Sequence, residues 1–274
     1  MTFAGYICRT CGVQFAESAE PPEECPVCLD ERQYVGTDGQ LWTTPDELRQ
    51  QHQADIREEE PGLTGIGMKP SFAIGQRALL LETPDGNVLW DCIPLLAEEM
   101  VSFVRSRGGL AAIAISHPHY YASLVEWGST FDARVYLHQA DSRWVMRQDP
   151  CVHFWSGEEC ELLPDVKLLR LGGHFAGGTV LHWRGGEKAG TLLSGDVVQV
   201  VADRRWLSFM RSYPNYIPVS DAEVQAIRNR LEPLKFDRIY GAWYDRVVAS
   251  EGKEAVRRSA ERYLAALRGI HAGD

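Results

Sequence analysis

The chain has 274 residues, of which 45% are hydrophobic and 24% charged, a composition typical of a globular protein with one large domain or two unequal ones. Lys and Arg number 28 and Asp and Glu number 38, so the formal net charge is −10. This charge argues against non-specific binding to nucleic acid or to an anionic membrane surface.

The cysteine pattern and the N-terminus together indicate where the protein works. The opening sequence MTFAGYICRTCGVQF lacks a charged region followed by an apolar one, so we expect no secretory signal. No run approaches the length of about 18 apolar residues that a membrane span needs. Four of the seven cysteines form two CxxC pairs, which favours metal binding over disulfides. We therefore expect a cytoplasmic protein.

Residues 1–40 are predicted to form a small metal-binding module. Cys8 and Cys11 make the first pair, and Cys25 and Cys28 make the second. Each pair is a tight turn that can point two thiolates at one ion, and the four complete a tetrahedral site. A segment with so few large apolar side chains needs the metal, which can supply about 10 kcal/mol of folding free energy.

This N-terminal stretch resembles the rubredoxin-like domains, in CRTCG and again in CPVC. The resemblance allows iron as well as zinc, because four thiolates alone do not choose between the two metals. We expect a structural zinc ribbon, with a redox iron site as the alternative. Cys92, Cys151 and Cys160 are expected to be buried bystanders.

The next segments predict a helix, a linker, a hairpin and a second helix. The sequence GQLWTTPDELRQQHQADIREEE indicates a short helix followed by a polar, Glu-rich linker. ProAspGlyAsn at residues 84–87, between two apolar runs, predicts a β-hairpin. From Pro94 to Arg107 the pattern is helical, and Gly108–Gly109 gives it a suitable end.

The rest of the chain alternates strand-like runs with helices, which we expect at 139–147, 220–233 and 251–268. The second of these helices starts with the capping-box sequence SDAE. RVYLHQ and TVLHW are also strand-like. This pattern predicts a layered α/β or α+β domain whose sheets are covered by helices. Four apolar runs end in polar or glycine-containing turns: AAIAIS before His117, VKLLRL before Gly172, TLLSG before Asp196, and DRIYG before Ala242.

The ends of these four strands are expected to meet in one cleft, since catalytic groups tend to lie on loops held by a rigid sheet. His117 and His119 flank Pro118. In an extended segment residues two apart point the same way, so both imidazoles could face one ion. His174 and Asp196 could complete the ligand set of zinc, iron or manganese.

With these residues the chain resembles the metallo-β-lactamase fold superfamily over roughly residues 70–250. The family's leading motif is HisXHisXAspHis, which here reads HPHYYA from His117. The family's next ligand, a histidine in a glycine-rich turn, matches His174 in GGHFAGG. Its bridging aspartate matches Asp196 in LLSGDVV, and its last histidine falls at Trp243 in IYGAWYD.

The resemblance implies a four-layer αββα sandwich over residues 41–274, preceded by the four-cysteine module. Asp91 in VLWDC matches a buried aspartate that the family uses to support its metal-binding loops. All three histidines of the family's first metal site are present. Three of the four ligands of its second site are replaced, by Tyr121, Ala122 and Trp243. The resemblance therefore implies one metal ion rather than two, with Trp243 filling the space of the missing ion.

The predicted function is a metal-dependent hydrolase of the ester, thioester or lactone class that acts on a small-molecule substrate. Zinc held by three histidines would lower the pKa of its bound water to about 7 and supply metal-bound hydroxide. Asp196 would orient the water or accept its proton. Tyr121 is a second candidate catalytic residue as a hydrogen-bond donor, and Tyr120 is a candidate for lining the substrate.

The segment RRWLSFMRSYPNYIP, residues 204–218, is basic and aromatic in an otherwise acidic chain. Arg211 is the best candidate for pairing with an anionic group of the substrate, because arginine binds carboxylate or phosphate with two hydrogen bonds. Tyr213 and Trp243 are further candidates for the substrate site. The alternative is an ordinary loop that packs over the sheet.

Two other functions stay open at the level of sequence. A mononuclear iron site with two histidines and a carboxylate activates oxygen, and one branch of the superfamily oxidises persulfides in that way. The extra ligand His119 weighs against this redox hypothesis. The domain could instead be a non-enzymatic binding or regulatory module stabilised by its metal. The sequence leaves the substrate, the metal at each site and the oligomeric state undetermined.

Overall fold

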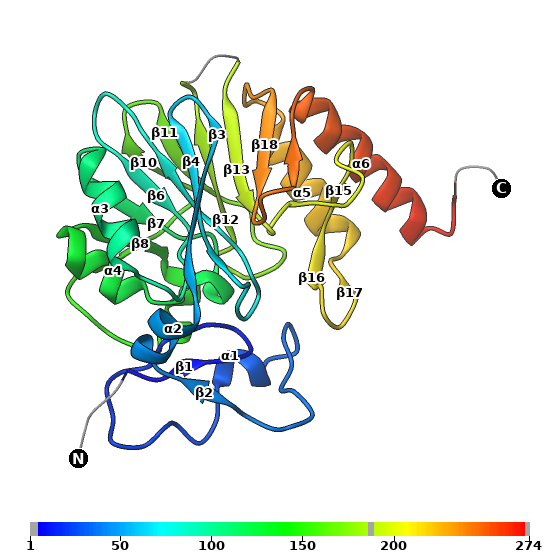
Figure 1. Cartoon of the computed structure of the whole chain (residues 1–274). Coiled ribbons are helices and arrows are strands. Elements are labelled where there is room, and N and C mark those ends of the chain that lie inside the picture. The colour runs from blue at the N-terminus through cyan, green and yellow to red at the C-terminus, as the bar shows by residue number, and fades with distance from the viewer. Residues whose placement is uncertain (1–4, 186–188, 272–274) are drawn as a thin grey trace. The chain divides into compact units, whose positions relative to one another are not determined.

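The computed structural model describes residues 5–185 and 189–271 of the chain (Figure 1). The chain forms two compact units, Met1–Ser156 and Gly157–Asp274. The predicted metal-binding module belongs to the first unit. The domain boundary expected at residue 40 stays a prediction.

The N-terminal ribbon is built from short elements around the cysteines. Two of these elements are β1 (Ile7–Cys8) and β2 (Trp42–Thr43), which pair antiparallel. Between them lies the one-turn helix α1 (Pro26–Leu29), and after them comes α2 (Pro45–Gln51). The Thr44 side chain caps α2 in a capping box with Glu47, so the predicted short helix after residue 40 is confirmed.

The first unit contains a seven-stranded sheet in the order β3-β4-β5-β6-β7-β8-β9. The first three pairs are antiparallel and the last three are parallel. The hairpin predicted at residues 84–87 is confirmed, because it joins β5 to β6. The strands are β3 (Gln53–Glu60), β4 (Leu63–Lys69), β5 (Ala78–Leu81), β6 (Val88–Trp90), β7 (Ala112–Ala114), β8 (Arg134–His138) and β9 (Val152–Trp155).

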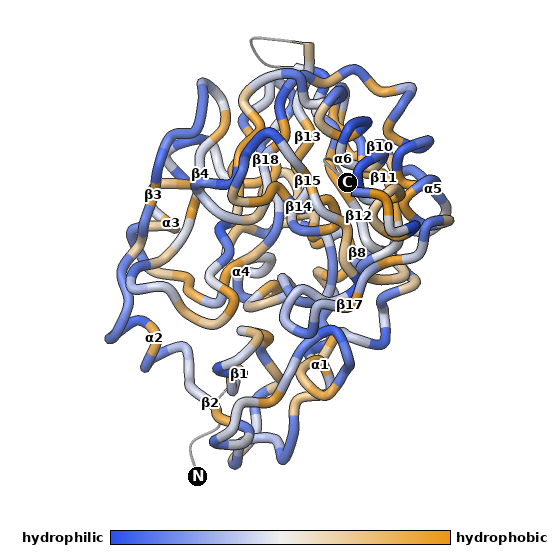
Figure 2. Tube along the Cα trace, turned by 90° about the vertical axis from the view of Figure 1, so that its right-hand side faces the viewer, coloured by the Kyte–Doolittle hydropathy of each residue, from blue (hydrophilic) through white to orange (hydrophobic). Residues whose placement is uncertain are grey.

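The polar, Glu-rich linker predicted after α2 is wrong, because this segment is the edge strand β3. Its charged residues pair along the whole length of β4, from Gln53 opposite Lys69 to Glu60 opposite Leu63. In Figure 2 the strand is drawn mostly in the hydrophilic colour. Charged side chains on an edge strand discourage pairing with another chain, and they also hide the strand from an interpretation based on hydrophobic alternation.

Two helices cover one face of this sheet, as Figure 1 shows for α3 (Glu98–Ser106) and α4 (Leu124–Phe131). Each connects neighbouring parallel strands, and right-handed crossovers place such helices on the same face. α3 is shorter at its N-terminus than the predicted 94–107, and it ends before Gly108–Gly109 as expected. The helix predicted at 139–147 is instead a 3-10 helix, η2 (Gln139–Trp144).

The second unit contains a six-stranded sheet in the order β10-β11-β12-β13-β18-β19. All its pairs are antiparallel except β13 with β18. Two small hairpins, β14/β15 and β16/β17, follow β13. The strands are β10 (Glu159–Leu163), β11 (Val166–Arg170), β12 (Thr179–Trp183), β13 (Thr191–Gly195), β14 (Gln199–Val200), β15 (Leu207–Ser208), β16 (Met210–Ser212), β17 (Ile217–Pro218), β18 (Arg238–Gly241) and β19 (Val247–Val248).

The predicted C-terminal helices are confirmed as α5 (Asp221–Leu231) and α6 (Gly252–Leu267). The capping box expected at the start of α5 is formed by Ser220 and Glu223. Both helices contribute buried aliphatic side chains to a core that includes Phe209 and Ile239. Each fully buried aliphatic side chain of this kind contributes about 1.5–3 kcal/mol to stability.

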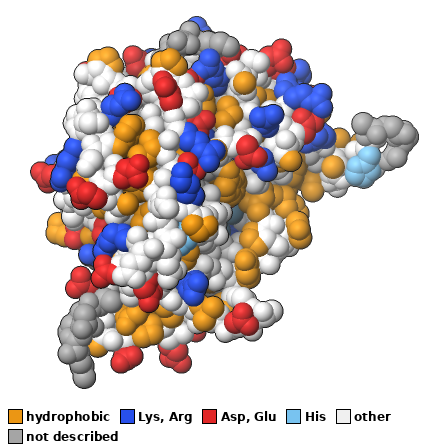
Figure 3. Space-filling view, in the orientation of Figure 1, with side chains coloured by type: hydrophobic (Ala, Val, Ile, Leu, Met, Phe, Trp, Pro, Cys, Tyr) orange, Lys and Arg blue, Asp and Glu red, His pale blue; other side chains and the backbone are white. Residues whose placement is uncertain are grey.

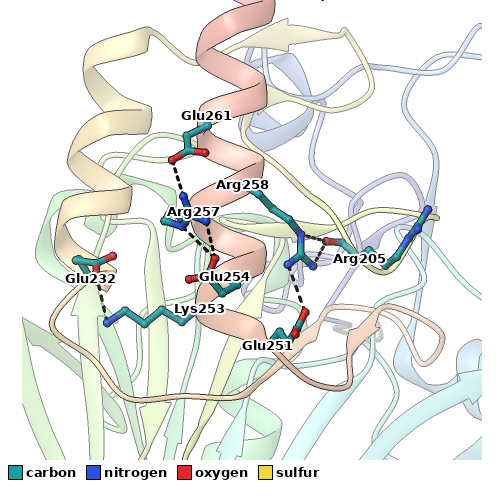
Figure 4. Close-up of polar contacts among 8 residues, drawn as sticks. All are labelled: Arg205, Glu232, Glu251, Lys253, Glu254, Arg257, Arg258 and Glu261. Carbon is teal, nitrogen blue, oxygen red and sulfur yellow. Dashed lines mark hydrogen bonds and ion pairs between the residues drawn. The ribbon is translucent and has the colours of Figure 1, made fainter. Parts of the chain in front are cut away.

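The exposed face of α6 carries a network of charges (Figure 4). Arg257 pairs with Glu254 at 2.8 Å and Glu261 at 3.1 Å, one helical turn away on either side. Arg258 donates to the main-chain carbonyl of Arg205 and so ties the helix to the turn before β15. Exposed pairs of this kind contribute only a few tenths of a kcal/mol each, so the network adds little to stability.

On the face of the molecule shown in Figure 3, acidic and basic side chains are interspersed. Hydrophobic side chains gather there between α6 and β15, where Trp206 and Tyr263 line a groove. Among the described residues, no helix is both long and apolar enough to cross a membrane.

Candidate metal centres

The four cysteines of the ribbon come together as one cluster. Their Sγ atoms all lie within 4.8 Å of one another, and all four side chains are buried. The Cys8 and Cys28 sulfurs are 3.5 Å apart, and those of Cys11 and Cys25 are 3.7 Å apart. Sulfurs at the corners of a tetrahedral zinc site are separated by about 3.8 Å, given zinc–sulfur bonds of about 2.3 Å. The donor set therefore fits one tetrahedral ion.

The cluster is built by two turns of the backbone. In the first, the Gly12 amide donates to the Cys8 carbonyl at 2.8 Å, and Gly12 has a φ of 82°, which disfavours other residues. In the second, the Cys28 amide donates to the Cys25 carbonyl at 3.0 Å at the start of α1. These are the turns that the two CxxC pairs predicted.

The electrostatics of the cluster favour a bound cation. Hydrogen bonds from the other thiols, first from Cys11, lower the pKa of Cys8, whereas burial raises the pKa of Cys11. One thiolate is thus stabilised by its neighbours, and further thiolates are disfavoured until an ion neutralises them. The Gln40 side chain, which no sequence pattern singled out, donates to the Cys8 sulfur at 3.1 Å and accepts from the Cys25 amide at 3.2 Å.

Cys92, Cys151 and Cys160 lie outside this cluster, as expected, but the expectation that all three are buried is wrong for Cys151 and Cys160. Cys92 is fully buried, and burial raises the pKa of its thiol well above the ordinary value. Cys151 and Cys160 are half-buried, and burial raises the pKa of Cys151 to about 12. All three are therefore protonated, unreactive thiols at neutral pH.

The first unit also brings His117 and His119 side by side. The expected extended geometry is wrong here, because residues Pro118–Tyr120 form a 3-10 turn, η1, that begins directly after His117. Proline at the first position of the turn favours this conformation. The two imidazole rings nevertheless lie 5.3 Å apart between centroids, and both are buried. The pair is suited to sharing one ion, although by a turn rather than by strand alternation.

Two neighbours orient the His117 ring. Its Nδ1 is 2.8 Å from the Ser116 hydroxyl, and when Nδ1 donates this hydrogen bond, Nε2 carries the lone pair that can ligate a metal. The Tyr120 ring packs against it, with centroids 4.3 Å apart, and is fully buried. Tyr120 therefore packs against the His117 ring, and its predicted role in lining the substrate stays a prediction.

Asp91 holds the strand end that leads to these histidines. Its carboxylate accepts from the Ser116 amide at 2.7 Å, and its own amide donates to the Ala114 carbonyl at 2.8 Å. Asp91 is buried and has a φ of 62°, which aspartate tolerates better than most residues. These contacts match the supporting role that the resemblance implied for this residue.

Tyr121 and Ala122 follow η1 and lie against the ribbon. Tyr121 lines a cavity of about 10 Å³ together with Gln14 and Val145. Burial, and after it the charge of Asp141, raise the pKa of Tyr121, so its phenol stays neutral. The catalytic role suggested for Tyr121 stays a prediction.

In the second unit, His174 is positioned by a glycine-rich turn in which Gly172 and Gly173 both have positive φ values. Its Nδ1 is 3.0 Å from the main-chain carbonyl of Met210. A carbonyl can only accept, so the proton is on Nδ1 and Nε2 carries the lone pair that can ligate a metal. Orientation by a backbone carbonyl is the usual arrangement for a metal-ligating histidine.

Asp196 lies next to His174 at the end of β13. Its Oδ1 is 4.0 Å from the His174 Nε2, and both side chains are buried. The hydroxyl of Tyr213 donates to the Asp196 carbonyl at 3.0 Å and lies 3.3 Å from the Ser208 carbonyl. Burial and the nearby charge of Asp196 raise the pKa of Tyr213. Tyr213, predicted to bind substrate, thus braces the turn that carries Asp196.

The remaining predicted residues are also in the second unit. Arg211 lies on β16, next to the carbonyl that orients His174, and is half-buried. Trp243 occupies a tight turn between β18 and β19, in which the Arg246 amide donates to the Trp243 carbonyl at 3.0 Å. Substrate binding by these two residues stays a prediction.

Solved metallo-β-lactamases share the fold of this chain. The TMB-1 enzyme aligns with a TM-score of 0.58 at 13% identity, over 79% of this chain and 98% of that one. DIM-1 exposed to ceftazidime gives 0.57 at 14% identity, over 76% and 97%. A B3 enzyme described as the first with an active-site glutamic acid gives 0.51 at 20% identity, over 80% and 90%. The expected metallo-β-lactamase fold, with a cysteine cluster at its N-terminus, is confirmed.

A sequence relative defines the family more closely. The chain is 48% identical over 265 residues to "Uncharacterized protein YmaE" of Bacillus subtilis (strain 168), and the alignment covers 96% of each protein. This chain belongs to the YmaE family. No protein-family model matches it.

Proposed function

We propose that the protein is a metal-dependent hydrolase of small esters, thioesters or lactones, with one ion bound by His117, His119 and His174. We call this ligand set the histidine site and the four cysteines the cysteine site. The observation that carries the proposal is that Nδ1 of His117 and Nδ1 of His174 each have a hydrogen-bond partner, so that Nε2 of each ring faces the proposed ion. The Ser116 hydroxyl is the hydrogen-bond partner of Nδ1 in His117, and the Met210 carbonyl is the partner of Nδ1 in His174. The fold shared with metallo-β-lactamases supports the proposal that His117 and His119 of the first unit and His174 of the second bind the same ion.

Zinc is the metal we propose for both sites. At the cysteine site, four thiolates form the closed tetrahedral set of a structural ion. At the histidine site, three neutral imidazoles form a set that leaves one position for water or substrate. A metal there would lower the pKa of water and polarise a carbonyl oxygen.

The side chains around the histidine site divide the remaining work. Asp196 is close enough to His174 to orient a water molecule and accept its proton. The Tyr213 hydroxyl donates to the main-chain carbonyl of Asp196, and this bond would hold the Asp196 carboxylate in position. Arg211, on the strand that orients His174, is placed to pair with an anionic group of the substrate.

The test uses purified protein loaded with zinc and a panel of ester, thioester and lactone substrates. We expect hydrolysis of at least one class, and we expect Asp196→Asn to lower kcat by about 100-fold while metal content is unchanged. Asp203→Asn, at an exposed turn of the same unit, is the matched control. No hydrolysis of any class, or full activity in Asp196→Asn, would contradict the proposal.

A non-enzymatic binding module is the second candidate, favoured by the replacement of three family ligands by Tyr121, Ala122 and Trp243. Such a module would keep the ion for stability and would need no exchangeable water on it. Anions that bind zinc, such as azide, would then leave the spectrum of the cobalt-substituted histidine site unchanged. A spectral shift on adding azide favours the hydrolase.

A further inference from the structure

The ribbon contacts the loop that carries His117 and His119 at the positions where the second-metal ligands are replaced. The amide of Gln14 donates to the carbonyl of Ala122 at 3.1 Å. Ala122 has a φ of 43°, a left-handed conformation that a residue with a side chain adopts only when its surroundings hold it there. The bond from Gln14 is one of the contacts that hold it.

The Gln14 side chain adds a second connection to the same loop. Its Nε2 donates to Oε1 of Glu126 at 2.7 Å, and its Oε1 accepts from Nη1 of Arg147 at 3.0 Å. Arg147 also pairs with Glu126 directly. Glu126 lies in the first turn of α4, directly after the loop. The amide of Gln14 donates to the carboxylate with its nitrogen and accepts from the guanidinium with its oxygen, which a glutamate at this position could not do.

The cysteine turn itself packs onto the support of the loop. A Cβ atom at Gly12 would lie 2.7 Å from Cγ of Pro94, so only glycine fits this approach. The Pro94 carbonyl accepts from the Ser123 hydroxyl at 2.8 Å, at the other end of the loop. Cys11, Gly12 and Gln14 are close neighbours in sequence, so the conformation of the cysteine site and the contact with the loop depend on each other.

We propose that the ribbon is a metal-dependent brace for the histidine loop, residues 117–123, with Gln14 as the positioning residue. An ion at the cysteine site fixes the turn at Cys8–Gly12, and this turn places Gln14 against Ala122 and Glu126. The brace replaces, by protein contacts, the ordering that a second metal ion would have given to residues 121 and 122. Loss of the ion or oxidation of the thiols would therefore loosen the histidine loop.

The inference rests on the proposed function only in assigning a metal to His117 and His119. It has two consequences. The cysteine site must fill first for the histidine site to reach its full affinity. The amides of the histidine loop should also exchange slowly with solvent only while the cysteine site is loaded, whatever the histidine site binds.

The experiment changes the amide without touching either ligand set. Gln14→Glu places a second carboxylate against Glu126 and removes the donor. The double variant Gln14→Glu/Glu126→Gln restores one amide and one carboxylate in exchanged positions. Gln50→Glu, on the exposed face of α2, makes the same charge change away from the loop and is the control.

Two measurements are made on all four proteins with zinc in the cysteine site: hydrogen exchange of residues 117–127, and zinc affinity of the histidine site by chelator competition. We expect Gln14→Glu to speed exchange and to weaken zinc binding about tenfold, the usual effect of losing an orienting contact. The double variant should recover both properties, and Gln50→Glu should match the wild type.

Unchanged exchange and affinity in Gln14→Glu would overturn the proposal, and so would a double variant that fails to recover either property. Removing zinc from the wild-type cysteine site must also speed exchange in the loop. If the wild type binds no second ion, the proposed function fails, but the exchange measurement still decides whether the ribbon braces the loop.

Discussion

The cysteine site and the histidine site differ in how the chain brings the metal ligands together. The cysteine site is local: four buried thiols from residues 8 to 28 lie within 4.8 Å of one another with their own turns around them. The histidines come from loops that two different sheets support, and each of the rings at His117 and His174 is oriented by a separate neighbour. A local set of four thiolates would close around its ion, whereas a set of three imidazoles would leave one coordination position open. Under the proposed function, the cysteine site would hold a structural ion and the histidine site an ion that can take part in the reaction.

The largest expected effect comes from breaking the closed site. Cys11→Ser removes one of four thiolates, and with it much of the folding free energy of about 10 kcal/mol that zinc can supply to such a module. We expect one fewer ion per chain and rapid proteolysis within residues 5–40, measured by elemental analysis and limited digestion. Cys160→Ser, at a half-buried cysteine outside the cluster, should behave like the wild type. Retention of the ion in Cys11→Ser would show that the cysteine site is not a four-thiolate site.

A smaller effect is expected from the support of the histidine loop. Asp91→Ala removes the carboxylate that accepts from the Ser116 amide, a buried hydrogen bond to a charged group. We expect a loss of about 2 kcal/mol in the free energy of unfolding in urea. Asp85→Ala, in the exposed hairpin turn, should cost little. A stability equal to that of the wild type would mean that the Asp91 carboxylate does not stabilise the histidine loop.

The smallest effect concerns a histidine that is buried without belonging to either ligand set. His182 is 4% exposed, and its Nε2 donates to the Lys235 carbonyl at 2.8 Å. Burial lowers the pKa of His182, so below about pH 6.5 the unfolded chain binds a proton that the folded chain does not. The stability contributed by neutral His182 is complete above that pH and is lost as the pH falls. His182→Gln should therefore lessen the acid sensitivity of urea unfolding, and an unchanged pH dependence would refute this role.

The features that the sequence predicted well depend on neighbours along the chain. The two CxxC pairs, the capping box at Ser220 and the hairpin at residues 84–87 each need only a few adjacent residues, and all are confirmed. The order of strands and turns around His117, His174 and Asp196 was enough to recognise the fold.

Features set by distant contacts could not be predicted in the same way. The strand β3 is stabilised by pairing with β4 over its whole length, and its charges alone predict a linker. Gln14 and Glu126 are 112 positions apart, so nothing near either residue indicates their hydrogen bond. The Met210 carbonyl, which fixes the tautomer of His174, belongs to the backbone and has no signature in the sequence at all.

The most direct test of two unlike metal sites is the zinc content per chain of the wild type and of His174→Ala, measured by elemental analysis. We predict two ions in the wild type and one in His174→Ala, with the remaining ion on the cysteines. His153→Ala, at a histidine outside both sites, should keep two. An unchanged zinc content in His174→Ala would contradict the assignment of the histidine site.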